Sequence, residues 1–213
     1  MEPLSIVIFI FILLFSVIFH EVAHGLVAER LGDPTARYSG RLTLNPIPHI
    51  DLFGSILLPA FLFWAGLPVL GAAKPVPVNF QNLRNMKRDT ILVSLAGPAT
   101  NFLLAALAGL IFRYSPGLSD MGAALLLQTV SLNLVLGLFN LVPVPPLDGS
   151  KVLASILGLI DENLMFYFFQ FERFGIFLVY LLLVAGVLFR ILIPPLLILF
   201  KVFTGIGYPS GLF

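Results

Sequence analysis

The chain of 213 residues contains no cysteine and few charged residues. Without cysteine it forms no disulfide and no thiolate metal site, so redox chemistry does not indicate a compartment. Charged residues make up 11% of the chain and apolar residues 59%, whereas soluble domains have roughly 25% and 45–50%. The mean hydropathy is +1.03. No basic tract indicates a nucleic-acid partner. These values exclude an ordinary soluble domain and predict an integral membrane protein within a lipid bilayer.

Four long apolar segments predict membrane-crossing helices. They cover residues 4–31, 91–112, 121–141 and 174–203. The last segment is interrupted by Arg190 and Pro194-Pro195, so it either bends or divides into two passes. We predict a short helix near the membrane surface at residues 151–160.

A fifth apolar segment, residues 52–70, is ambiguous because glycine and proline interrupt it. Positive charge helps to decide its course, since short loops rich in Lys and Arg stay on the cytoplasmic side. Seven of the twelve Lys and Arg residues flank it: Arg30, Arg37, Arg41, Lys74, Arg84, Lys87 and Arg88. All seven share one side only if the segment enters the membrane and returns. We therefore predict a re-entrant segment whose non-helical backbone is covered by protein or water.

The sequence His20-Glu21-Val22-Ala23-His24 is an H-E-x-x-H motif inside the first predicted membrane helix. Positions i and i+4 share one face of a helix, so both imidazoles can bind one metal ion. Glu21 is then close enough to act on a metal-bound water. Ionisable side chains at membrane depth usually mark function. The motif predicts a zinc hydrolase that works within a bilayer.

A catalytic zinc ion usually has three protein ligands, so the motif lacks one. The candidates are Asp33, His49, Asp51 and Asp148. Asp148 is the strongest, because it follows prolines that end the third membrane helix and let a carboxylate turn inward. With a re-entrant segment at 52–70, Asp148 emerges on the same side as the histidines. An N-cap of the helix at 151–160 is the alternative role for Asp148.

Two motifs together resemble the site-2 protease family of intramembrane zinc metalloproteases. They are His20-Glu21-x-x-His24 and Asn140-x-x-Pro143-x-Pro145-x-x-Asp148-Gly149, in this order on membrane helices. The sequence Ser94-x-Ala96-Gly97-Pro98-x-x-Asn101 between them is also similar to the family. The resemblance covers about residues 15–155.

The resemblance implies a three-helix catalytic core with a membrane-associated β-hairpin region between the first two core helices. Together with the apolar segments and the charge pattern, it leads us to expect an all-α polytopic membrane protein with a re-entrant or β-hairpin segment and one or more additional C-terminal membrane helices. Many relatives carry a PDZ or CBS domain, for which this chain has no room. We therefore expect a minimal form, with the metalloprotease core at residues 1–160 and the C-terminal transmembrane part at 161–213.

The resemblance further implies one Zn2+ per chain, held by His20, His24 and Asp148, with Glu21 as general base. The substrates would be membrane-anchored proteins, cut near the cytoplasmic leaflet. We expect a multi-pass protein of the cell membrane whose active site faces the cytoplasm.

Several roles stay open at this point. Asn140 is the candidate donor to the oxyanion, with a helix-packing hydrogen bond as an equal alternative. His49 and Asp51 fit either an outer shell of the metal site or a satisfied turn. A metal ion transporter or an inactive membrane scaffold would use the same polar residues. The missing internal repeat argues against a transporter, and Glu21 argues against a scaffold.

Overall fold

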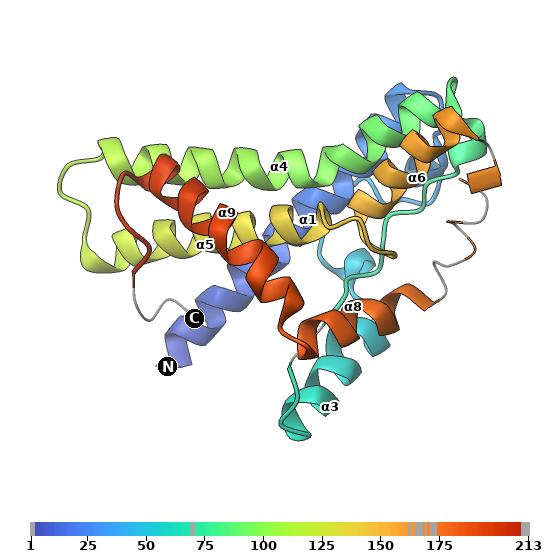
Figure 1. Ribbon diagram of the computed structural model, residues 1–213. Helices are drawn as coiled ribbons and strands as arrows, with labels where there is room; N and C mark the ends of the chain where they lie inside the picture. The colour runs from blue at the N-terminus through green and yellow to red at the C-terminus, as the bar shows by residue number, and fades with distance from the viewer. Residues whose placement is uncertain are drawn as a thin grey trace.

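The computed structural model describes residues 3–68, 71–161, 163–164, 168, 170 and 174–209. Every regular element in these residues is helical (Figure 1). Four described helices are long and apolar enough to cross a membrane. They are α1 (Pro3–Arg30), α4 (Met86–Tyr114), α5 (Asp120–Asn140) and α9 (Val187–Thr204). The prediction of an all-α membrane protein with several spans is therefore confirmed.

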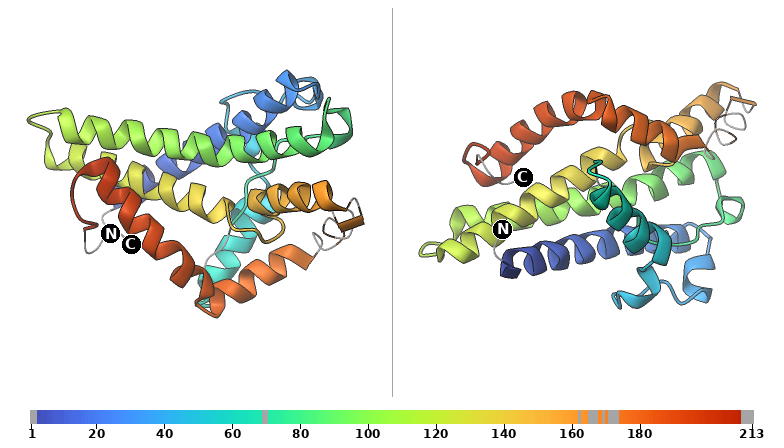
Figure 2. Two further views of the ribbon diagram at one scale, coloured as in Figure 1. Left: turned by 45° about the horizontal axis from the view of Figure 1, so that its top comes forward. Right: turned by 90° about the horizontal axis from the view of Figure 1, so that it is seen from below.

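Helix α4 lies along α5 and also packs against α1 and α9, as two further views show (Figure 2). Small residues allow these close approaches, which is usual where lipid gives no hydrophobic drive for helix association. A Cβ atom at Gly109 of α4 would lie 2.9 Å from the Phe203 backbone oxygen of α9. Ala105 and Ala108 share a buried cluster with Leu196 and Phe200 of α9. The membrane helices are thus held by close contact at small side chains.

Helix α4 begins five residues before the predicted start at 91, because its first turn is capped by polar side chains. The Asn85 side chain accepts a hydrogen bond from the Arg88 backbone N–H at 3.1 Å. In return, Asp89 accepts one from the Asn85 backbone N–H at 2.9 Å. This reciprocal arrangement satisfies two amides at the helix start. A hydropathy pattern does not register such a charged first turn.

The C-terminal segment divides at Gly186 into α8 (Gly175–Val184) and α9. Gly186 has φ of +71°, the left-handed conformation that commonly ends a helix. The predicted division is thus present, but its predicted position at Arg190 and Pro194-Pro195 is wrong, because these residues lie within α9. Helix α8 has 10 residues, and its length of about 15 Å is too short to cross roughly 30 Å of hydrocarbon.

The residues between α1 and α4 form short helical turns. These are α2 (Thr35–Tyr38), η1 (Ile47–His49), η2 (Leu52–Leu57), α3 (Leu58–Trp64) and η3 (Phe80–Asn82). The β-hairpin that the resemblance implies is not seen among residues 31–68 and 71–85. Prolines are part of the reason, since Pro75 and Pro77 have no N–H group to donate to a partner strand.

The segment that contains η2 and α3 returns to its starting point. The Lys74 N–H donates to the His49 carbonyl at 2.9 Å, and the Ala72 N–H donates to the Gly54 carbonyl at 3.0 Å. Helix α3 extends away from the rest of the bundle (Figure 1), and its residues Phe63 and Trp64 are exposed. The two ends of this apolar segment are therefore neighbours.

Residues 74–79, which we call the strap, run extended from this segment back toward α4 and are anchored at both ends. The Arg41 guanidinium donates to the Lys74 carbonyl at 2.6 Å. At the other end, buried Asp33 accepts from the Asn79 N–H at 2.7 Å and from the Asn82 side chain at 2.8 Å. Burial raises the pKa of Asp33, but hydrogen bonds from Thr35, Asn82 and Asn79 lower it by more than burial raises it. The pKa therefore lies below its ordinary value.

Asp33→Asn should loosen the strap. The NH2 group of the new amide would face the N–H groups that now donate to the Asp33 carboxylate. We expect the free energy of unfolding to fall by about 1.5–3 kcal/mol at pH 7. Because the folded-state pKa is lowered, the carboxylate stabilises the fold above its ordinary pKa and loses this effect as pH falls. The difference between variant and wild type should therefore shrink below about pH 4.

Thermal unfolding in detergent measures the stability, and hydrogen exchange at Asn79 and Asn82 measures the strap. Asp120→Asn, at an exposed position in the first turn of α5, is the matched control. Equal exchange rates in the strap of wild type and Asp33→Asn would contradict the anchoring role.

Candidate metal centre

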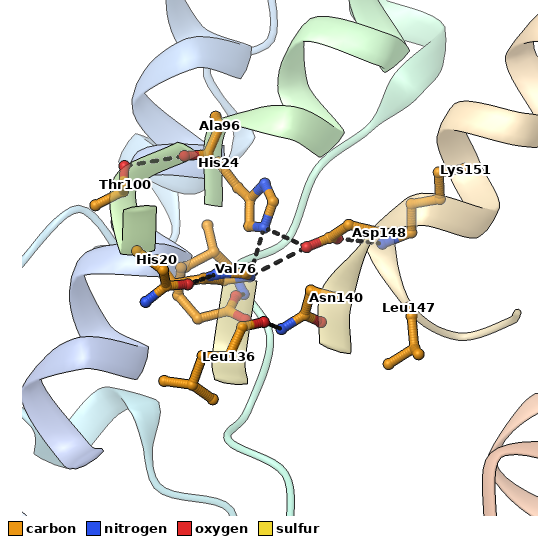
Figure 3. A network of polar contacts seen from close by, with 12 residues as sticks. His20, His24, Val76, Ala96, Thr100, Leu136, Asn140, Leu147, Asp148 and Lys151 are labelled. Atoms are coloured by element: carbon orange, nitrogen blue, oxygen red, sulfur yellow. Dashed lines mark hydrogen bonds and ion pairs between the residues drawn. The ribbon is translucent and has the colours of Figure 1, made fainter. Parts of the chain in front are cut away.

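Three polar side chains from two distant parts of the chain converge beside α4 (Figure 3). His20 and His24 come from α1, and Asp148 is the first residue of α6 (Asp148–Ile160). Asp148 Oδ2 lies 3.1 Å from Nε2 of each histidine, and the two Nε2 atoms are 3.0 Å apart. The residues are 6%, 9% and 7% exposed, respectively. The structure thus brings together the three residues that the sequence predicts as metal ligands.

Hydrogen bonds on the far side of each ring determine what the imidazoles present to this cluster. Nδ1 of His24 lies 2.7 Å from the Val93 carbonyl oxygen, which can only accept, so Nδ1 carries the proton. Nδ1 of His20 lies 2.6 Å from Asn101 Oδ1 and donates in the same way. In a neutral ring with Nδ1 protonated, Nε2 is the nitrogen that carries a lone pair, and here each Nε2 faces the other and a carboxylate oxygen. A divalent cation among the three atoms would be bound by all three.

The spacing of the three atoms fits zinc. Four ligands arranged tetrahedrally around zinc at 2.0–2.1 Å are separated from each other by about 3.3–3.4 Å. The observed 3.0–3.1 Å differs from this by only a few tenths of an ångström. Two imidazole nitrogens with one carboxylate are also a usual donor set for catalytic zinc, whereas Ca2+ and Mg2+ prefer oxygen ligands.

Two glycines make room for the cluster. A Cβ atom on Gly97 of α4 would lie 2.4 Å from Nε2 of His24 and 2.5 Å from Nε2 of His20. A Cβ atom on Gly149 would lie 2.2 Å from the Leu141 carbonyl oxygen, where α6 starts close behind the end of α5. Only glycine fits at these two positions without a shift of backbone or ligand.

Asp148 is held as an acceptor for the cluster. Lys151 Nζ lies 3.7 Å from Asp148 Oδ1, and this positive charge favours the ionised carboxylate that metal binding requires. The N-cap position of α6 is occupied by Leu147, without a side-chain hydrogen bond. The alternative role of Asp148 as an N-cap is therefore not seen.

Glu21 lies one residue from His20 and lines a cleft of about 280 Å³ together with His24 and Asp148. The Val76 backbone N–H of the strap donates to Glu21 Oε2 at 2.7 Å. The strap forms one wall of the cleft, and Ser94 of α4 and Lys151 of α6 line it as well. One oxygen of the Glu21 carboxylate is thus held by the backbone beside the three converging side chains.

The other ligand candidates have structural partners elsewhere. Asp33 anchors the strap, as described above. His49 is buried with Nε2 2.9 Å from the Thr43 carbonyl oxygen, and Asp51 accepts from the Gly54 N–H at 2.6 Å. For Asp51 the satisfied turn is therefore what the structure contains, whereas Nδ1 of buried His49 has no hydrogen-bond partner among the described residues. Asn140 donates to the Leu136 carbonyl of its own helix at 2.9 Å, and its catalytic role stays a prediction.

Sequence reasoning missed polar residues that adjoin the site. Lys151 Nζ lies 3.7 Å from Asp148 Oδ1, three residues earlier in the same helix. The predicted helix began only at residue 151, so the sequence alone did not place the two residues on one helix face. Ser16 and Asn133 belong to the hydrogen-bonded network behind His20. Ser16 is one of two polar residues in an otherwise apolar run and lies four positions before His20, a signal that was available.

The chain is similar to known metalloproteases. A family model described as peptidase family M50 matches residues 118–186. YwhC of Bacillus subtilis, named as a zinc metalloprotease, is 36% identical over 97% of this chain and 96% of its own length. Rip2 of Mycolicibacterium smegmatis, also named as a zinc metalloprotease, is 32% identical over 74% of this chain and 61% of its own length. No solved structure matches the chain.

Gly97→Ala should abolish metal binding without lowering the helix propensity of α4. Alanine is a better helix former than glycine, so the expected loss arises from the contact of its methyl group with both Nε2 atoms. Zinc content of the purified protein, measured by atomic absorption, should fall to background. Gly109→Ala is the matched control, since it also meets a tight contact in α4 but lies far from the cluster. Equal zinc content in Gly97→Ala and Gly109→Ala would refute this prediction.

Proposed function

Because this chain belongs to peptidase family M50, the site-2 protease family, and is an intramembrane zinc metalloprotease, we propose that His20, His24 and Asp148 hold the zinc ion. The observation that carries this assignment is the triangle of two Nε2 atoms and one carboxylate oxygen with sides of 3.0–3.1 Å. Three electron-pair donors at this spacing suit one divalent cation with a fourth position left for water or substrate.

Glu21 is the general base of the proposed mechanism. When bound, zinc supplies a Lewis acid that lowers the pKa of a water molecule and polarises the scissile carbonyl group. Glu21 takes the proton of the attacking water and returns it to the departing amide nitrogen. The Val76 N–H occupies Oε2 of Glu21, so the other carboxylate oxygen carries out the transfer.

Asn140 is our candidate for the donor that stabilises the oxyanion. Its side-chain amide has two N–H groups, and one of them donates to the Leu136 carbonyl. The second N–H would donate to the developing negative charge on the substrate oxygen.

The substrate in this proposal is a membrane-anchored protein whose helix is locally unwound, because an intact helix hides its peptide groups. The unwound segment lies against the strap. Pro75 and Pro77 have no N–H, and the Val76 N–H is already donated to Glu21. This wall therefore offers mainly carbonyl oxygens, which would accept from the N–H groups of an extended peptide.

We place residues 52–70 as a re-entrant segment, with the catalytic site near the cytoplasmic face of the cell membrane. The hydrogen bond between Lys74 and His49 supports an entry and exit on one side. The basic residues 30, 37, 41, 74, 84, 87 and 88 all belong to elements around the C-terminal end of α1, as the Arg84 N–H bond to the Leu31 carbonyl illustrates. Such a concentration of Lys and Arg favours the cytoplasmic side.

We divide the chain into a catalytic core at residues 1–160 and a C-terminal membrane part at 161–213. The three helices of the core are α1, α4 and α5. The C-terminal part supports the core, since Val179 of α8 and Leu188 of α9 share a buried cluster with Val142 and Leu147, next to Asp148.

Glu21→Gln and His20→Ala together test the proposed function. Glu21→Gln should retain its zinc and lose cleavage of a single-span substrate with a destabilised helix, because only the base is removed. His20→Ala should lose both zinc and cleavage. Zinc content and product formation are measured in detergent and in liposomes.

Undiminished cleavage by Glu21→Gln would eliminate the proposed base, and full zinc content in His20→Ala would eliminate that ligand. The same proteoliposomes also address the competing functions. Uptake of zinc that is unaffected by Glu21→Gln would favour a transporter, and wild-type protein that holds zinc but cleaves no substrate would favour a scaffold.

Asn140→Leu separates an oxyanion donor from a helix-packing residue. Loss of the donor should lower kcat by about 10²- to 10³-fold and leave zinc content unchanged. Thr100→Val is the matched control, because it removes a comparable hydrogen bond to the carbonyl four residues earlier. If Asn140→Leu changes only the thermal stability, as the control does, Asn140 is a packing residue.

A further inference from the structure

We propose that Asn133 of α5 is a positioning residue for the metal centre. Through Asn101 it fixes which ring nitrogen of His20 carries the proton and thereby leaves Nε2 of His20 free to bind zinc. This inference rests on the proposed function, in which His20 is a ligand. It extends that function to a residue outside both sequence motifs.

The observation is a buried chain of hydrogen bonds that links three helices. His20 Nδ1 of α1 lies 2.6 Å from Asn101 Oδ1 of α4. The Asn101 side-chain nitrogen donates to Asn133 Oδ1 of α5 at 2.9 Å and, over a longer distance of 3.4 Å, to the Ser16 backbone carbonyl oxygen of α1. The Asn133 side-chain nitrogen donates to Ser16 Oγ and to the Thr129 carbonyl oxygen, both at 2.9 Å. Asn101 and Asn133 are completely buried, so water does not compete for these bonds.

The direction of every bond in this chain follows from the group at its far end, the Thr129 carbonyl oxygen. The Thr129 carbonyl oxygen can only accept, so the nitrogen of the Asn133 amide must face it. The Asn133 oxygen then faces Asn101 and needs a donor, which must be the Asn101 nitrogen. The Asn101 oxygen is left for His20, and it requires a proton on Nδ1. The Thr129 carbonyl oxygen on α5 thus acts through two amides on the tautomer of a ring on α1, and the longer bond from Asn101 to the Ser16 carbonyl oxygen favours the same orientation.

His24 provides an internal comparison. Its Nδ1 donates directly to the Val93 backbone carbonyl, so no side chain can change its tautomer. The tautomer of His20 depends on the Asn101 amide, which can rotate by 180° and exchange its nitrogen and oxygen once Asn133 no longer offers it an acceptor. If Asn101 rotates, its nitrogen faces Nδ1, and the ring carries its proton on Nε2. That proton would point at His24 and Asp148 and occupy the position of the metal.

A purely structural role for Asn133 must be distinguished from this one, since the network also joins α1, α4 and α5. Two variants separate the roles. Asn133→Leu has a similar size but removes the acceptor that orients Asn101. Asn133→Asp presents an oxygen to Asn101 in either protonation state and therefore preserves the orientation. In this second variant an ionised carboxylate would also face the Thr129 carbonyl oxygen, which destabilises the fold.

The experiment measures the zinc dissociation constant of the purified full-length chain in detergent by competition with a chelator, together with the Tm of the metal-free protein. Asn133→Leu should weaken zinc binding by about 10- to 100-fold, the range known for residues that orient metal ligands. Asn133→Asp should bind zinc nearly as the wild type does, although its metal-free Tm is the lower of the two. Ser131→Ala, on the same helix and equally buried, should leave the zinc affinity unchanged.

A rescue sharpens the test. In the double variant Asn101→Asp/Asn133→Leu, either carboxylate oxygen at position 101 can accept from His20 Nδ1, so zinc affinity should recover without Asn133. Asn133→Ala carries the same expectation as the leucine variant if the latter does not fold.

Wild-type zinc affinity in Asn133→Leu, with a loss confined to Tm, would overturn the inference and leave the proposed function intact. A zinc affinity that follows Tm across the two Asn133 variants would do the same. A wild-type protein that binds no zinc, or binds it as well after His20→Ala, would instead overturn the proposed function.

Discussion

Two imidazole nitrogens and one carboxylate oxygen face each other at 3.0–3.1 Å, and much of the structure serves to hold them there. Gly97 lets α4 approach both rings, and Gly149 lets α6 turn back behind α5 so that Asp148 reaches them. The C-terminal helices cover Leu147, the residue before this carboxylate. A site assembled in this way needs close helix contacts on every side.

Burial explains why the ring nitrogens of both histidines have protein partners on the side away from the cluster. A buried polar atom without a partner is costly. For His24 that partner is a backbone carbonyl, and for His20 it is a chain of two asparagines. Each partner also determines the position of a proton and therefore the ability of the ring to bind a metal. In this protein, hydrogen bonds that satisfy burial and hydrogen bonds that prepare the catalytic site are the same bonds.

Most of the membrane helices and the three converging residues could be predicted from local pattern. His20 and His24 share a helix face by their spacing, and Asp148 was identified because an even number of crossings returns it to their side. The strap could not be predicted in the same way. The resemblance implied a hairpin in this region, whereas the groups of the strap bind Glu21, Asp33 and Arg41. The interruption of the C-terminal segment was also misplaced, because a left-handed glycine stops a helix in a way that hydropathy does not record.

The sequence by itself determined the class of protein, and it supplied the metal ligands and the membrane side that we propose. These depend on periodicity, on hydrophobic length and on the number of crossings, all of which are properties of the chain read in one dimension. Only the tertiary structure decided what surrounds those ligands: the glycine contact at position 97, the backbone that holds Glu21, and the asparagines behind His20. The bonds to Glu21 and His20 join residues 55 and 81 positions apart, and their chemistry depends on distances and hydrogen-bond directions that no local pattern encodes.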